Sequence, residues 1–221
     1  METYYSKKEY NDMKKSYERK IKSLEKQVEK LTEKVKNKLA LQKELGLTED
    51  ENVLLVGCVS RLTWQKGFYL MMEQLSEICA MPIQLAVLGS GEASIEDKLR
   101  QLEAGNKGKI AFYNGYSDAL AHRIYGASDL FLMPSLFEPC GISQLISMRY
   151  GTLPLVRETG GLKDTVTPYN QYDKTGNGFS FTNYNSGEMV SIMKNAVDVY
   201  YNKPEDWNAL VCNALDTDVS W

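Results

Sequence analysis

The sequence predicts an α/β fold, a doubly wound parallel sheet preceded by a long amphipathic N-terminal helix. Short apolar runs alternate with helical segments from residue 47 to the C-terminus, which is typical of βαβ units with right-handed crossovers. Several of these runs lead into glycine-rich or polar loops. The N-terminal helix is indicated by residues 6–45, which contain no proline and precede the first glycine, Gly46.

The sheet is expected from apolar runs of strand length. In chain order, these runs are 53–59, 83–88, 110–113, 130–133, 153–156 and 178–181. The segments between and after them have helical patterns. We expect helices to begin near residues 67, 94 and 162, and to cover 117–126, 142–150, 187–201 and 205–215.

The N-terminal helix has an apolar stripe. The stripe has the a and d spacing of a heptad over about two repeats, and its residues are Ile21, Leu24, Val28, Leu31 and Val35. Lys20 at g and Glu25 at the next e have opposite signs, as in a parallel pair of helices. Such a helix either pairs with a second helix or lies on the body. The pattern slightly favours pairing, with self-association through residues 10–35.

The composition excludes several classes of protein. Hydrophobic residues make up 43% and charged residues 25% of the 221 residues, so a disordered or collagen-like chain is excluded. No window holds about 18 consecutive apolar residues, and the N-terminus has no apolar core, so we expect neither a membrane span nor a secretory signal. The four cysteines form no CxxC pair and His122 is the only histidine, so we expect no metal site. Four scattered cysteines indicate reduced thiols in a cytoplasmic protein.

Charge is distributed unevenly along the chain. Residues 1–44 carry 13 basic and 8 acidic residues, a net charge of +5, and the remainder carries −8. A basic arm is one signal of nucleic-acid or anionic-surface binding. Here the basic residues alternate with glutamates, which is typical of a solvated helix face, so we expect no nucleic acid and no membrane as partners.

Ligands bind parallel sheets outside the carboxyl ends of the strands. The loops that reach this edge are 60–67, 89–92, 114–117, 134–141 and 157–162. In the first loop, Arg61 and Lys66 lie five residues apart on a turn that opens a helix, an arrangement that suits a diphosphate. The alternative is that both are solvated surface cations.

Glycines mark the second loop. Gly89-Ser90-Gly91 resembles a phosphate-binding turn, but the pattern also suits an ordinary tight turn. It lacks the third glycine of the dinucleotide fingerprint, and the chain has no GxxxxGK[ST] motif, so a P-loop NTPase is not expected.

The remaining loops offer a carboxylate, an aromatic ring and paired glycines. Glu138 follows a buried strand, where it either accepts hydrogen bonds from sugar hydroxyls or caps the next helix. Tyr116 lies at the end of a strand, where its ring can stack on a nucleobase. Gly160 and Gly161 precede a short helix, where they either bring the backbone close to a ligand or form a plain turn.

Several of these motifs together resemble a known family. Residues 60–67, SRLTWQKG, look like the diphosphate loop of bacterial glycogen (starch) synthases. Residues 129–170, which include FEPCG and TGGL, are very similar to the most characteristic segment of that family, and residues 37–47 resemble the start of its C-terminal domain. The resemblance covers residues 37–221. It predicts a Rossmann-like donor-binding domain over residues 37–221, preceded by the amphipathic, coiled-coil-like helix of residues 1–36, which does not match the family.

The resemblance implies a retaining glucosyltransferase and one half of a GT-B fold, in which two Rossmann-like domains face a cleft. Members of the family move glucose from ADP-glucose to the non-reducing end of an α-1,4-glucan, without a metal or other cofactor. By the matching motifs, the residues that hold the diphosphate or contact the reacting glucose would be Arg61, Lys66 and Glu138. The donor-binding residues would be Tyr116, against the adenine; Cys140 and Gly141, in the glucose pocket; and Thr159, Gly160 and Gly161, through their backbone N–H groups.

The sequence also departs from the family. The family's N-terminal domain carries a K-x-G-G loop, a catalytic histidine and much of the acceptor site, and none of these matches this chain. We therefore expect a donor-binding fragment that is weak or inactive alone, or a half that acts in an assembly recruited by its helix. An alternative from a different class of function is a non-catalytic module that binds a nucleotide sugar or acts as a scaffold. ADP-glucose and UDP-glucose both stay open as donors.

Overall fold

The structure is a computed structural model that describes residues 7–219. Within the first helix, some side chains lie outside the described set, namely those of residues 7–11, 13, 23, 24, 26–28, 30 and 31.

The sheet has six strands, all parallel, in the order β3-β2-β1-β4-β5-β6. The strands are β1 (Leu54–Val59), β2 (Ile83–Gly89), β3 (Ile110–Asn114), β4 (Leu130–Met133), β5 (Leu153–Arg157) and β6 (Phe179–Phe181). Each predicted apolar run falls on one of them, because a strand covered on both faces needs a nearly continuous apolar sequence. The predicted Rossmann-like α/β class is confirmed.

The connections between strands are helical. Their bounds are η1 (Trp64–Lys66), α2 (Phe68–Glu73), α3 (Leu75–Ala80), α4 (Ala93–Gly105), α5 (Asp118–Ala127), α6 (Ser143–Arg149), α7 (Gly160–Thr165), α8 (Ser186–Asn202) and α9 (Pro204–Asp216). The helix expected from residue 67 is divided, because Gln74 has a φ of −119° and a ψ of 22°. The short helix expected from residue 162 already begins at Gly160, so its glycines form the first turn of the helix rather than a separate turn before it.

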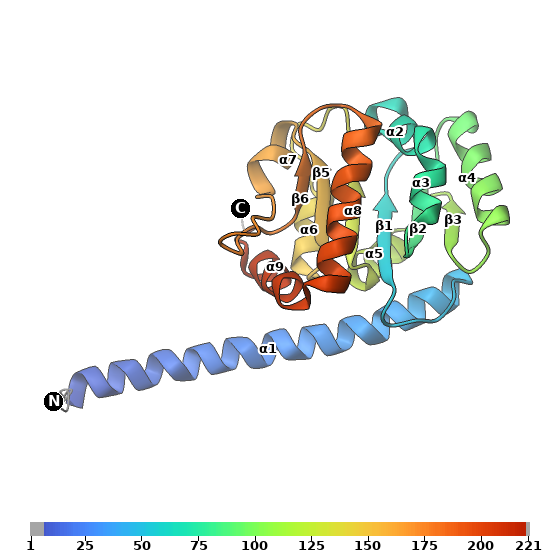
Figure 1. Cartoon of the computed structure of the whole chain (residues 1–221). Helices are drawn as coiled ribbons and strands as arrows, with labels where there is room; N and C mark the ends of the chain where they lie inside the picture. The colour runs from blue at the N-terminus through green and yellow to red at the C-terminus, as the bar shows by residue number, and fades with distance from the viewer. Residues whose placement is uncertain (1–6, 220–221) are drawn as a thin grey trace.

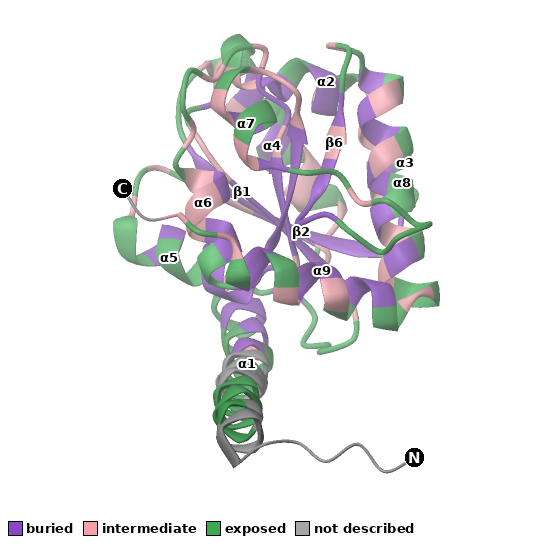
Figure 2. Cartoon of the chain, turned by 90° about the vertical axis from the view of Figure 1, so that its left-hand side faces the viewer, coloured by how far each residue is buried: buried purple, intermediate pink, exposed green. Residues whose placement is uncertain are grey.

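The sheet separates two apolar cores. On β1, Leu54, Val56 and Cys58 belong to the larger core, which α2, α3, α4, α8 and α9 cover. Leu55 points to the opposite face, where α5 and the C-terminal end of α1 cover the sheet. This alternation is the two-residue period of a strand. Figure 2 shows the buried strands between more exposed helices. Helices therefore cover both faces of the sheet, so a ligand can reach it only at the loops that follow the strand ends.

The first helix, α1 (Lys7–Leu45), has 39 residues. It passes the amino ends of the strands and extends well beyond the body on one side (Figure 1). The structure thus contains the long N-terminal helix that the sequence predicts. The expected domain boundary between residues 36 and 37 lies inside this helix and stays a prediction.

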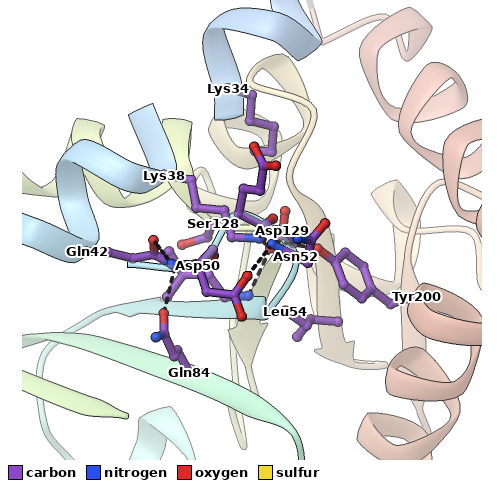
Figure 3. Close-up of polar contacts among 12 residues, drawn as sticks. Lys34, Lys38, Gln42, Asp50, Asn52, Leu54, Gln84, Ser128, Asp129 and Tyr200 are labelled. Carbon is purple, nitrogen blue, oxygen red and sulfur yellow. Dashed lines mark hydrogen bonds and ion pairs between the residues drawn. The ribbon is translucent and has the colours of Figure 1, made fainter. Parts of the chain in front are cut away.

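A buried ion pair attaches α1 to the body (Figure 3). Lys38 is only 2% exposed, and its Nζ lies 2.7 Å from Asp129 Oδ2. The same ammonium donates to the carbonyl of Glu51 at 2.9 Å and to the hydroxyl of Tyr200 at 3.2 Å. Asp129 Oδ2 also accepts the N–H of Leu55 at 2.8 Å, at the start of β1. The pair therefore joins the helix to the amino ends of two central strands.

Two further polar side chains of α1 are buried next to this pair. Lys34 Nζ lies 2.6 Å from Thr152 Oγ1, and burial lowers the pKa of this lysine to about 8. The amide of Gln42 donates to Gln84 Oε1 at 2.8 Å. The helix therefore docks through hydrogen bonds as well as through apolar contact.

The apolar stripe of α1 does not face the body where the structure describes it. Ile21 is 55% and Val35 is 39% exposed. Val35 follows the buried Lys34 directly, and consecutive helical residues point about 100° apart, so Val35 lies to one side of the docking face. The stripe residues Leu24, Val28 and Leu31 lie outside the described side chains. Pairing of this helix with a second helix stays a prediction.

Candidate functional site

The order of the strands places a crevice between β1 and β4. The chain moves from β1 outward through β2 to β3, then returns to the other side of β1 and moves outward through β4, β5 and β6. Loops at such a reversal point diverge, and ligands bind there at the carboxyl edge. The loops that flank this point are 60–67 and 134–141, the same two that carry the predicted cations and Glu138.

These two loops are in direct contact. The amide of Leu136 donates to the carbonyl of Gln65 at 2.9 Å. Gly67 has a φ of +77°, and a Cβ at this position would lie 1.9 Å from the carbonyl oxygen of Pro134. Only glycine combines this backbone conformation with so close an approach. The glycine that ends the first loop therefore sets the distance between the loops.

Lys66 and Glu138 meet across this contact. Lys66 Nζ lies 2.5 Å from Glu138 Oε2, and the two side chains are 22% and 13% exposed. The hydroxyl of Ser135 donates to the same carboxylate oxygen at 3.3 Å. Both charged side chains line a cavity of about 70 Å³, together with Gly141 and Ser143. Glu138 does not cap the next helix, because the N-cap of α6 is Ile142.

Arg61 and Tyr116 line an adjoining cavity of about 300 Å³. The two cavities share three lining residues, Val59, Ser60 and Ser143. The Tyr116 ring is 82% exposed, so its face is available to a flat partner. Arg61 therefore lies beside the Lys66–Glu138 pair rather than in contact with it. The predicted cations, carboxylate and aromatic ring occupy one continuous part of the carboxyl edge.

The Gly89-Ser90-Gly91 turn supports the first loop. A Cβ on Gly89 would lie 2.0 Å from the carbonyl oxygen of Ser60, and one on Gly91 would lie 2.2 Å from that of Leu62. These close approaches explain why both positions require glycine, without any role in binding a phosphate. Glu92, which sequence reasoning did not single out, accepts the N–H of Trp64 at 2.8 Å and so holds the same loop.

The paired glycines of the fifth loop pack under the fourth. A Cβ on Gly160 would lie 2.1 Å from the carbonyl oxygen of Glu138, and one on Gly161 would lie 1.9 Å from that of Cys140. The N–H of Gly161 donates to the carbonyl of Pro139 at 3.1 Å. This N–H therefore already has an acceptor in the loop backbone, and its expected approach to a ligand stays a prediction.

Not every predicted site residue borders the two cavities. Among the described residues that line them, Gly141 is present, but Cys140, Thr159, Gly160 and Gly161 are not. Cys140 is exposed on the loop, and Thr159 is the N-cap of α7. Gly160 and Gly161 instead pack against the backbone of residues 138–140.

Arg157 is a site residue that sequence reasoning missed. Its Nε donates to the carbonyl of Ser135 at 2.8 Å, and its Nη2 donates to that of Leu136. Its Nη1 donates to the carbonyl of Thr182 at 3.4 Å. Its position at the end of β5 was the only sequence signal, and position alone does not reveal which carbonyls a guanidinium meets.

Outside this edge, the described residues offer little comparable chemistry. His122 lies on the exposed side of α5, with Nδ1 3.3 Å from the hydroxyl of Tyr150. A larger cavity of about 520 Å³ lies beside α1 and is lined by Lys34, Arg149 and Tyr150 among others. Between residues 7 and 219, no group of three or more His, Cys, Asp or Glu side chains has metal-binding geometry. No helix in that range is long and apolar enough to span a bilayer.

Comparisons with known proteins show related sequences. The chain is 54% identical over 189 residues to the glycogen synthase of Lachnospira eligens, which covers 86% of this chain and 40% of that protein. It is 51% identical over 188 residues to the glycogen synthase of Clostridioides difficile, covering 85% of this chain and 39% of that protein. The chain thus spans about two fifths of the length of these relatives.

Solved structures share the fold. The catalytic domain of starch synthase IV from Arabidopsis thaliana, bound to ADP and acarbose, matches with a TM-score of 0.79 and 36% identity over 85% of this chain and 40% of that chain. HepE from Anabaena, in complex with UDP-glucose, shares the fold with a TM-score of 0.63 at 21% identity over 81% of this chain and 47% of that chain. The family model described as glycosyl transferases group 1 matches residues 37–209. The chain belongs to the group 1 glycosyl transferases.

Proposed function

We propose that this chain is the donor-binding half of a glycogen or starch synthase. In this proposal it binds ADP-glucose for transfer of glucose to the non-reducing end of an α-1,4-glucan, in the cytoplasm and without a metal. The observation that carries the proposal is the Lys66–Glu138 pair at the reversal point of the sheet, with Arg61 and Tyr116 lining the adjoining cavity. The identity to glycogen synthases and the ADP bound in the starch synthase structure support it.

Each side chain has a role that its surroundings permit. Lys66 has three N–H donors, so it can keep Glu138 and still donate to a phosphate oxygen. Arg61, in the adjoining cavity, would contact the other end of the diphosphate. Positive charge at both positions stabilises the leaving nucleoside diphosphate as the glycosidic bond breaks. Glu138 would accept a sugar hydroxyl, and Tyr116 would stack on the base.

Transfer requires a second wall to the cleft. Catalysis depends on interactions that hold both reactants in the transition state, and here the acceptor would need groups beyond this site. We therefore propose weak or no transfer by this chain alone. The exposed residues Ile21 and Val35 of α1 favour a role for this helix in self-association or in recruiting another chain.

Calorimetry on the purified chain tests the donor site. We expect ADP and ADP-glucose to bind, and Glu138→Gln to lower the affinity for ADP-glucose about tenfold while changing that for ADP less than threefold. Lys163→Gln, on α7, is the control and should bind as the wild type does. Absence of binding to ADP, ADP-glucose and UDP-glucose would refute the proposal. Tighter binding of UDP-glucose than of ADP-glucose would change the donor.

Sedimentation tests the proposed role of α1. We expect an increase in mass with concentration that Ile21→Glu abolishes. A monomer at all concentrations would contradict self-association, and recruitment of a different chain would then have to be sought separately.

A further inference from the structure

Arg157, at the end of β5, contacts the loop that carries Glu138 without lining either cavity of the site. We infer that Arg157 and Tyr184 together form a clamp that positions the two ligand loops and decides how well the site distinguishes a nucleotide sugar from the bare nucleotide. The ligand part of this inference rests on the proposed function, whereas the positioning part does not.

The guanidinium of Arg157 joins three backbone carbonyls. Two belong to the fourth loop, Ser135 and Leu136, and the third is Thr182, just after β6. A loop beside a cavity has few regular backbone partners, and a buried carbonyl without a donor is costly. One planar group with donors in a fixed fork satisfies all three and holds the loop against the end of the sheet.

The two carbonyls are adjacent to the groups that form the site. Ser135 uses its hydroxyl to donate to Glu138 Oε2 at 3.3 Å, the oxygen that also accepts Lys66. Leu136 uses its N–H to donate to the carbonyl of Gln65 at 2.9 Å, next to Lys66. Arg157 therefore acts on the Glu138 carboxylate through Ser135. Through Leu136 it acts on the loop of residues 60–67, here called the lysine loop.

Tyr184 adds a second link to the lysine loop. Its ring lies 5.9 Å from Cζ of Arg157, within the range of a cation–π contact. Its hydroxyl donates to the carbonyl of Trp64 at 3.3 Å. The clamp thus runs from the end of β5 through the segment after β6 to both ligand loops.

The two loops depend on the clamp to different degrees. The lysine loop has independent support, because Glu92 accepts the N–H of Trp64 and Leu62 forms a bridge with Gly91. Of the five residues 134–138, Ser135 and Leu136 both have their carbonyls held by Arg157. Loss of the guanidinium should therefore disturb the glucose contact of Glu138 more than the phosphate contacts of Lys66.

The test compares Arg157→Lys with Arg149→Lys, a matched change at an exposed arginine at the end of α6. In the full chain, calorimetry should show that Arg157→Lys lowers the affinity for ADP-glucose about tenfold or more and that for ADP less than threefold. Hydrogen exchange of the Leu136 amide should become about tenfold faster. Arg149→Lys should change none of these values. Equal losses for the two ligands, or unchanged exchange at Leu136, would overturn the inference.

Two further results separate this inference from the proposed function. If the wild type binds no nucleotide, the proposed function fails, and the exchange rate at Leu136 still decides whether Arg157 positions the loop. If Arg157→Lys does not fold, Tyr184→Phe replaces it, because it removes only the hydroxyl that meets Trp64. We expect Tyr184→Phe to lower the affinities for ADP and ADP-glucose alike, by about threefold, and to speed hydrogen exchange at the amides of Lys66 and Gly67. Wild-type binding and exchange in Tyr184→Phe would overturn the clamp.

Discussion

Two lysine–carboxylate pairs lie at opposite edges of the same sheet, and they have different surroundings. At the amino edge, Lys38 donates to three protein acceptors, Asp129 among them, so all of its N–H groups are used. Both pairs border a cavity, but at the carboxyl edge Lys66 has a single acceptor among the described residues, Glu138. A pair whose donors are all used within the protein maintains the fold. A pair with unused donors beside a cavity is available to a ligand.

The largest expected effect is on the amino-edge pair. Lys38→Met should lower the free energy of unfolding by about 3–5 kcal/mol, because it leaves the carboxylate of Asp129, which is only 12% exposed, without its cation. Denaturant unfolding followed by circular dichroism measures this. The matched change Lys66→Met should cost less, about 1 kcal/mol, because Lys66 makes one hydrogen bond where Lys38 makes three, and its side chain is 22% rather than 3% exposed. Equal losses would remove the distinction between the two pairs.

The next effect concerns the contact between the ligand loops. Gly67→Ala should destabilise the chain by about 2–3 kcal/mol, since it combines a φ of +77° with a Cβ 1.9 Å from the carbonyl oxygen of Pro134. Gly105→Ala, where nothing lies within 4 Å of the added Cβ, is the control and should be neutral or slightly stabilising. A Gly67→Ala chain as stable as the control would show that the loops can separate at little cost.

A smaller effect sharpens the role of the carboxyl-edge pair. Lys66→Met should weaken ADP binding by about 10–100-fold, the range expected when a hydrogen bond to a charged group is lost. Titration calorimetry measures it, with Lys163→Met as the matched control. Unchanged ADP affinity in Lys66→Met would mean that this lysine only forms an ion pair with Glu138, as Lys38 does with Asp129, and does not bind the nucleotide.

The smallest effect is a dependence of stability on pH at the amino edge. The pKa of Lys34 is lowered from 10.5 to about 8 by burial. Between pH 8 and pH 10.5 the unfolded chain therefore binds more protons at this residue than the folded chain, so its contribution to stability rises with pH. The rise should be about 1 kcal/mol from pH 8 to pH 9.

Subtracting the stability of Lys34→Met from that of the wild type isolates this rise. The subtraction also removes the opposite trend from Cys58, because burial raises the pKa of that thiol to about 12 and lowers stability as the pH rises above 9. A difference that stays constant from pH 8 to pH 9 would show that Lys34 is not titrating in the folded chain.

The predicted strands were the most successful part of the sequence analysis. The runs at 83–88 and 130–133 became β2 and β4 nearly residue for residue, because strands buried on both faces must be apolar throughout. The short helix of α7 was placed two residues late. Its glycines were expected either to bring the backbone close to a ligand or to form a plain turn, whereas in the structure they let the start of the helix touch the backbone of residues 138–140. Such a contact depends on a distant loop and leaves no local signal.

The sequence by itself determined the α/β class, the strands, the long first helix and the loops that reach the carboxyl edge, because apolar periodicity and turn residues are local properties of a chain. Only the tertiary structure decided which charged side chains meet. Lys38 and Lys66 are both lysines in helical or turn segments, yet Lys38 has three acceptors in the protein and Lys66 has one among the described residues. The same holds for Arg157, whose three carbonyl partners come from two loops. Pairing between distant charges depends on the order of the strands and the packing of the loops, which no local pattern encodes.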